Sequence, residues 1–134
     1  MLSSVRRDNH STVHIVEGDP AVARGIALML EGLETQVKLH SSAEELLSEP
    51  TLNHGGCLVI EVNLPGMGGL ELLNTLRSRG VDLPAILLTS KGDIPTAVRA
   101  MRAGALDFLE KPFLNRVLIK RVQQALNLAA DSAT

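Results

Sequence analysis

Apolar and polar positions along this chain follow two periods that replace each other repeatedly. Short runs of β-branched and aliphatic residues predict strands near residues 12–17, 35–39, 57–60, 85–90 and 106–110. In the segments between these runs, apolar residues recur every three to four positions, as on one face of an amphipathic helix. Strands that alternate with helices are typical of a parallel sheet covered on both faces.

Helix-start signals support this alternation. Asp19 followed by Pro20 is a strong helix start, because Asp caps the free amides and Pro suits the first turn. Ser42 with Glu45 has the spacing of a capping box, and Asp93 can cap a later helix. We therefore expect an α/β, flavodoxin-like sandwich of three layers, with five parallel strands in the order 2-1-3-4-5.

One domain accounts for the whole pattern. A chain of 134 residues suits a single core. Residues 1–11 are polar and are predicted to be a loose tail, and residues 12–128 form the predicted domain. Residues 129–134 are predicted to be a C-terminal tail or the start of a linker.

Composition narrows the function classes. The net charge is −2 and only two aromatic residues are present, so we expect no direct nucleic-acid binding by this domain. No apolar run is long enough to span a membrane, and no signal peptide is evident. The single cysteine, Cys57, fits a buried position in a reducing compartment, so we expect a cytoplasmic protein.

Candidate chemistry gathers at the ends of the predicted strands. Glu17, Glu61, Thr89 and Lys111 each fall at the carboxyl end of a different strand. An open parallel sheet binds ligands at this edge, and the predicted order brings strands 1 and 3 together. Taken singly, each residue has an ordinary explanation as a strand end or a solvated charge. The combination indicates one shallow site.

The chain resembles response-regulator receiver domains over residues 12 to about 128. Three segments carry the resemblance: VHIVEGDPAV at 13–22, LVIEVNLPGMGGLELL at 58–73, and AILLTSKGDIPTAVRAMRAGALDFLEKPF at 85–113. The last segment is the most specific. It is similar to receivers whose regulators carry a helix-turn-helix output domain.

The resemblance implies a set of roles. In that family an aspartate at the end of strand 3 accepts a phosphoryl group from a histidine kinase, and an acidic pair after strand 1 holds Mg²⁺. A Thr or Ser and a Lys bind the phosphoryl oxygens, and an aromatic residue on strand 5 moves with the Thr. By position, these phosphoryl-binding and switch roles fall to Thr89, Ser90, Phe108 and Lys111, and Lys111-Pro112 resembles the cis peptide of the family.

Two departures from that pattern fall on the chemistry. The phosphoacceptor position is Glu61, and the direct metal ligand of the acidic pair is replaced by Gly18, beside Glu17. Mg²⁺ demands near-octahedral geometry, so only a weak site from Glu17, Glu61 and the carbonyl of Asn63 remains conceivable. The extra methylene of Glu61 moves its oxygens by about 1 Å, which can slow the chemistry on the order of 10²-fold.

We therefore expect a degenerate receiver domain that acts as a phosphorylation-independent interaction module, with no enzyme activity and no cofactor. Its surface would be the face made by the fourth predicted helix, which Asp93 caps, the strand near 106–110 and the fifth predicted helix, which carries Leu118 and Val122; the family uses this face for homodimers and for output domains. Two alternatives stay open: a receiver that a histidine kinase still phosphorylates with Mg²⁺, and a small flavodoxin-like enzyme or cofactor binder. The last lacks a Gly-rich phosphate loop after strand 1.

The role of Glu61 also has two interpretations. Its longer side chain could reach Thr89 and Lys111 and hold an active-like state without phosphate. Alternatively, the site has lost its chemistry and only the surface is used.

Overall fold

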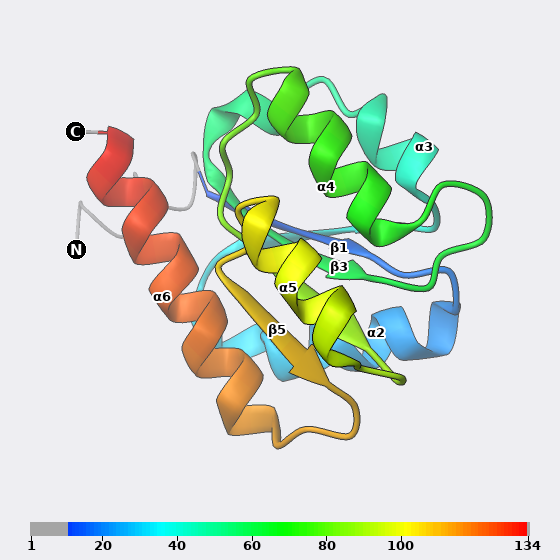
Figure 1. Ribbon diagram of the computed structural model, residues 1–134. Coiled ribbons are helices and arrows are strands. Elements are labelled where there is room, and N and C mark those ends of the chain that lie inside the picture. Colours follow the sequence, from blue (N-terminus) through cyan, green and yellow to red (C-terminus); the bar gives the residue numbers. More distant parts are fainter. Residues whose placement is uncertain (1–10, 134) are drawn as a thin grey trace.

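A computed structural model describes residues 11–133, in which a five-stranded parallel sheet forms the middle layer (Figure 1). The strand order is β2-β1-β3-β4-β5, as the sequence predicts. The strands are β1 (Thr12–Val16), β2 (Gln36–His40), β3 (Gly56–Glu61), β4 (Ala85–Thr89) and β5 (Asp107–Glu110). Every neighbouring pair is parallel, so the carboxyl ends of all strands share one edge.

The helices cover both faces of the sheet. They are α2 (Pro20–Met29), α3 (Ala43–Leu47), α4 (Gly69–Ser78), α5 (Ile94–Arg102) and α6 (Asn115–Ala133), with short 3₁₀ turns η1 (Glu31–Leu33) and η2 (Leu52–His54). Helices α3, α4 and α5 lie on one side of the sheet and α2 and α6 on the other (Figure 1). The flavodoxin-like three-layer prediction is confirmed.

Two separate apolar clusters hold these layers together. One packs Leu58, Ile60 and Leu87 of the sheet against Leu72 and Leu76 of α4. The other packs the opposite side chains of the same strands, including Cys57 on β3, against α2 and α6. All six residues of β3 are buried, which is expected for a central strand covered on both faces.

The C-terminal boundary of the predicted domain shifts. The helix from Asn115 continues to Ala133, beyond the predicted domain end at residue 128. Alanine has the highest helix propensity, so the alanine-rich end continues the helix although it lacks large apolar residues. Of the predicted N-terminal tail, residues 1–10 lie outside the described residues.

The predicted caps are present. The Asp19 carboxylate accepts from the backbone N–H of Ala21 at 2.9 Å, and the Asp93 carboxylate accepts from that of Thr96 at 2.7 Å. Ser42 Oγ accepts from the backbone N–H of Glu45 at 3.0 Å. These caps fix the starts of α2, α3 and α5, and the start of α2 follows Glu17 by only a few residues.

The start of α4 is fixed by close backbone packing. A Cβ atom at Gly69 would lie 2.4 Å from the carbonyl oxygen of Glu61 and 2.9 Å from the Cα of Val62. Only glycine allows this approach, because it carries no side chain. The chain therefore returns directly against the end of β3, and the Glu61 side chain emerges at a tightly determined place.

Candidate functional site

Three charged side chains meet at the carboxyl edge of the sheet. Lys111 Nζ lies 2.5 Å from Glu61 Oε1 and 3.3 Å from Glu17 Oε2. Glu17 follows β1, Glu61 ends β3, and Lys111 follows β5, so three strands position the cluster. Both carboxylates are buried, with 8% of Glu17 and 5% of Glu61 exposed.

The remaining carboxylate oxygens are held by the main chain. Glu17 Oε1 accepts from the backbone N–H of Asp19 at 3.0 Å. Glu61 Oε2 accepts from the backbone N–H of Asn63 at 2.9 Å. Every carboxylate oxygen of the pair therefore already has a hydrogen-bond donor, either an amide or Lys111.

The cluster keeps Lys111 charged. Burial alone would lower the pKa of the Lys111 ammonium, but its hydrogen bond to Glu61 and the charges of Glu61 and Glu17 outweigh burial and hold the pKa above its ordinary value. Two carboxylates face one ammonium, so the cluster carries a net charge of −1. The Lys111–Pro112 peptide bond is cis, as the sequence indicates.

Thr89 is close by but is held by other partners. Its buried hydroxyl accepts from Asn63 Nδ2 at 3.3 Å and from the backbone N–H of Lys91 at 3.1 Å. Within residues 11–133 it forms no hydrogen bond to Glu61. The expectation that Glu61 reaches both Thr89 and Lys111 is therefore correct for Lys111 and wrong for Thr89, whose hydroxyl is bonded to Asn63 and Lys91 instead.

The other predicted switch residues lie around the β4–α5 loop. Ser90 is exposed, and Phe108 is half-buried against the cluster that contains α4. A Cβ atom at Gly92 would lie 3.3 Å from the Phe108 ring and 3.4 Å from the carboxyl carbon of Glu110. The loop is thus packed closely onto β5.

Gly18 contributes no ligand atom at the predicted metal position. A Cβ atom there would lie 3.2 Å from Pro65 Cδ, so even a small side chain would need the Pro65 ring to shift slightly. Across the part of the chain that the structure describes, no three His, Cys, Asp or Glu side chains are placed to hold one metal ion. The donors that remain are the two carboxylates already bound to Lys111.

The profile of the response regulator receiver domain matches residues 13–123. The chain belongs to this family. The transcriptional regulatory protein FixJ of Azorhizobium caulinodans is 41% identical over 119 residues, which are 89% of this chain and 56% of that protein. The response regulator TmoT of Ectopseudomonas mendocina is 37% identical over 122 residues, which are 91% of this chain and 56% of that protein.

Solved structures agree with this assignment. The response regulator StyR has a TM-score of 0.85 at 35% identity, over 92% of this chain and 63% of that one. FixJ-N has a TM-score of 0.79 at 42% identity, over 87% of this chain and 94% of that one. This receiver domain spans little more than half the length of the regulators FixJ and TmoT. The alternative of a flavodoxin-like enzyme or cofactor binder finds no support in these likenesses.

The receiver domain also contains a polar pair that the sequence did not indicate. His14 on β1 and His40 at the end of β2 are both buried, with His14 Nδ1 3.0 Å from His40 Nε2. Burial, and for His14 also the neighbouring His40, lowers the pKa of both rings, that of His14 to about 4. Both rings are therefore neutral at pH 7. The signal was available in the strand register, because Val16 pairs with His40 and His14 lies two positions earlier on the same face.

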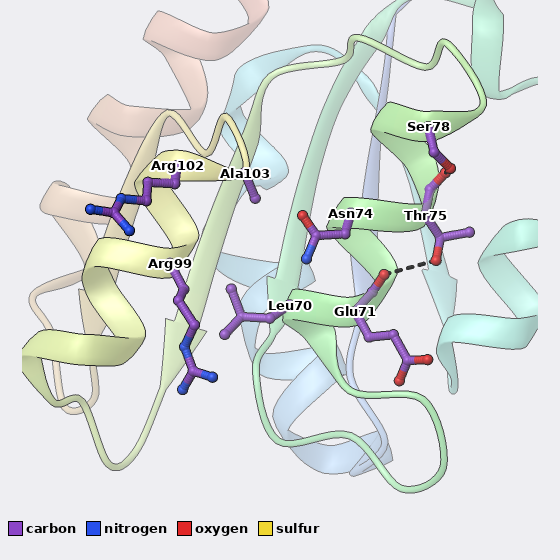
Figure 2. Close-up of a pocket in the computed structure, with 8 residues that line it drawn as sticks. All are labelled: Leu70, Glu71, Asn74, Thr75, Ser78, Arg99, Arg102 and Ala103. Atoms are coloured by element: carbon purple, nitrogen blue, oxygen red, sulfur yellow. Dashed lines mark hydrogen bonds between the residues drawn. The ribbon is translucent and has the colours of Figure 1, made fainter.

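Two hollows lie on the surface nearby, one of them bordered by Lys111 of the charged cluster. A groove of about 750 Å³ separates α4 and α5, and in Figure 2 Leu70 and Asn74 extend from α4 toward α5. Its walls are Leu70, Glu71, Asn74, Thr75, Ser78, Arg99, Arg102 and Ala103. A smaller, mainly apolar hollow of about 310 Å³ lies between α2 and Lys111–Phe113. Neither hollow includes Glu17, Glu61 or Thr89.

Within the described residues, no helix is long and apolar enough to cross a membrane.

Proposed function

We propose that this receiver domain works without phosphorylation, as a cytoplasmic interaction module of a transcriptional regulator. The observation that carries the proposal is the Lys111 ammonium, which contacts both Glu61 and Glu17. In the pattern that the sequence resembles, the corresponding Lys binds an incoming phosphoryl group. Here a fixed carboxylate already takes that contact.

The nucleophilic position is poorly suited to phosphoryl transfer. One oxygen of Glu61 bonds to Lys111 at 2.5 Å and the other to the Asn63 amide at 2.9 Å. Each oxygen is therefore held in place by a donor that also draws electron density from it, which makes it a weaker nucleophile toward phosphorus. Phosphoryl transfer depends on accurate positioning and on neutralisation of charge, and both are compromised at this site.

Magnesium does not fit the residues present. It requires several oxygen ligands in near-octahedral geometry. Gly18 supplies no side-chain oxygen, and the oxygens of Glu17 and Glu61 are bonded to Lys111 and to backbone amides. The cation at this edge of the sheet is therefore the side chain of Lys111.

The surface that we propose for partners is formed by α5, β5 and α6. These elements are the fourth predicted helix, the fifth predicted strand and the fifth predicted helix. Three apolar side chains on α5 are exposed: Ile94 at 79%, Val98 at 41% and Met101 at 51%. They recur at spacings of four and three, so they share one helix face. Arg121 of α6 forms an ion pair with Asp107 of β5, which joins these two elements.

The partner on this surface is a second copy of the domain or an output domain of the same regulator. The relatives that this chain matches are named as transcriptional regulators and are longer than the matched region. A DNA-binding output is therefore proposed for the whole regulator and not for this domain.

The deciding experiment is intact-mass measurement after incubation with acetyl phosphate and Mg²⁺. The variants are the natural chain, Glu61→Asp, and the double variant Gly18→Asp/Glu61→Asp, with circular dichroism to verify folding because Pro65 must shift when Gly18 gains a side chain. We expect no added phosphoryl group on the natural chain and labelling of the double variant. Labelling of the natural chain to a similar extent would show that this is a working phosphoreceiver.

The phosphoreceiver is the second candidate, and a kinase assay separates it further. A histidine kinase that phosphorylates receivers of the FixJ type should transfer no label to the natural chain. Transfer that is abolished by Glu61→Gln would support the second candidate.

A further inference from the structure

Asn63 joins the acidic position to the loop that leads to α5. Its backbone N–H donates to Glu61 Oε2 at 2.9 Å, while its side-chain Nδ2 donates to Thr89 Oγ1 at 3.3 Å. One residue therefore holds the carboxylate with its main chain and the hydroxyl with its side chain. Rotation of the Glu61 carboxylate would strain or break its hydrogen bond to the Asn63 peptide unit.

Thr89 passes this contact on to the β4–α5 loop. Its hydroxyl oxygen also accepts from the backbone N–H of Lys91 at 3.1 Å. A hydroxyl oxygen has two lone pairs, and these two donors use both. The position of the hydroxyl is thus set jointly by Asn63 and by the first turn of the loop.

The loop is in turn bound to β5. The backbone N–H of Gly92 donates to Glu110 Oε2 at 3.2 Å. A Cβ atom at Gly92 would lie 3.3 Å from the Phe108 ring and 3.5 Å from the Thr89 methyl carbon. Rotation of Thr89 about χ1 would exchange its hydroxyl and methyl positions and so disturb this packing.

The hydrogen bond between the Asn63 side chain and Thr89 can be broken easily. Thr89 is fully buried, whereas Asn63 is exposed to solvent. Its bond to Thr89 therefore competes with water, while the backbone bond between Asn63 and Glu61 is part of the loop itself. The hydrogen bond from Asn63 to Thr89 can therefore break while the end of β3 stays folded.

We propose that Asn63 is a positioning residue that couples Glu61 to the β4–α5 loop and hence to the α5–β5–α6 surface. While Lys111 and the Asn63 amide hold Glu61, the Asn63 side chain holds Thr89 and keeps the loop packed on Phe108. This inference rests on the proposed function, because it specifies how a fixed Glu61 is read at the partner surface.

Backbone amide chemical shifts test the coupling directly. In a ¹⁵N-labelled chain, Glu61→Gln removes the charge at the start of the series, and the amides of Lys91 and Gly92 report on its end. We expect Glu61→Gln to shift both amides in the natural background. The same change should have no effect on them in an Asn63→Ala background.

Two further variants complete the experiment. Asn74→Ala removes an exposed asparagine on α4 and should leave the effect of Glu61→Gln intact. Asn63→Leu keeps the approximate size of the side chain but has no hydrogen-bonding group, so it should suppress the effect as Asn63→Ala does.

Equal shifts at Lys91 and Gly92 with and without the Asn63 side chain would overturn the coupling. That outcome would leave the phosphorylation assay unaffected, so the two proposals fail separately. If the natural chain is phosphorylated while Asn63→Ala still abolishes the effect, the coupling stands and the proposed function falls.

Discussion

Two polar clusters lie within the same sheet, and they solve the problem of buried ionisable groups in opposite ways. At the carboxyl edge, Glu17 and Glu61 form ion pairs with Lys111. On β1 and β2, His14 and His40 stay neutral and share a hydrogen bond. The stability of the first cluster requires all three side chains, whereas the stability of the histidine pair varies with pH.

The pKa shifts have opposite consequences for stability. The raised pKa of Lys111 means that its stabilising contribution is present below pH 10.5 and is lost only as the pH rises above that value. The lowered pKa values of His14 and His40 make their contribution complete above pH 6.5, and it is lost as the pH falls. As the pH falls, the stabilising contribution of the histidine pair should therefore be lost, whereas the Lys111 ammonium stays charged.

The largest effect is expected from Lys111→Ala, which breaks the charged cluster. It leaves two buried carboxylates without their cation. Because Lys111 is itself 24% exposed, we expect a loss of about 2–3 kcal/mol in the free energy of unfolding, below the range for fully buried pairs. Urea denaturation at pH 7 measures it.

Lys120→Ala, at an exposed position on α6, is the matched control and should change stability by less than about 0.5 kcal/mol. If Lys111→Ala were equally mild, the carboxylates would not depend on Lys111.

The histidine pair should produce an acid dependence of similar size. Between pH 6.5 and about 4 the unfolded chain binds a proton at His14 that the folded chain does not. This lowers the free energy of unfolding by up to about 3 kcal/mol, and His40 acts in the same direction. Denaturation at pH 7, 6, 5 and 4 should show this loss in the natural chain.

His14→Leu should flatten this pH profile between 6.5 and 4, whereas His54→Gln, at an exposed position, should leave it unchanged. An unaltered profile in His14→Leu would mean that other groups cause the acid dependence. The carboxylate of Glu49, whose pKa its hydrogen bond to Thr51 lowers to about 2, loses its contribution at lower pH, from 4.5 downward.

Gly69→Ala should separate the backbone beneath the charged cluster from the histidine pair. The new Cβ would lie 2.4 Å from the carbonyl oxygen of Glu61, so the start of α4 must move. We expect a loss of about 1–3 kcal/mol, with NMR shift changes at Glu61 and none at His14. Shift changes spread equally over both clusters would contradict this separation.

The smallest effect is expected at Gly25, which, unlike Gly69, has open space around the position of a Cβ atom. A Cβ there meets no atom within 4 Å, and the residue lies inside α2. Gly25→Ala should therefore raise the free energy of unfolding by about 0.5–1 kcal/mol, measured by the same urea titration. A destabilised Gly25→Ala variant would show that α2 needs flexibility there.

The sequence was sufficient for the fold because each level of evidence agreed. The apolar runs, the caps at Asp19 and Asp93, and the alternation of elements all required the same layered sheet. The gathering of Glu17, Glu61 and Lys111 followed from the strand order alone, since parallel strands end at one edge.

The contacts that could not be predicted from the sequence depend on the path of one loop and on the register of two strands. Whether Thr89 bonds to Glu61 or to Asn63 is decided by the path of the loop after β3, which no residue pattern specifies. The histidine pair depends on the register between β1 and β2, where a shift of one residue would send one ring to the other face.

The buried position of Cys57 has a practical consequence for labelling. This sole thiol of the chain lies 0% exposed beneath α2 and α6, and burial raises its pKa to about 12. Thiolate is the reactive form of cysteine, so maleimides and thiol-reactive spin labels should not react with Cys57 at neutral pH. A cysteine introduced on the exposed face of α5 should therefore carry a single probe without prior removal of the native one.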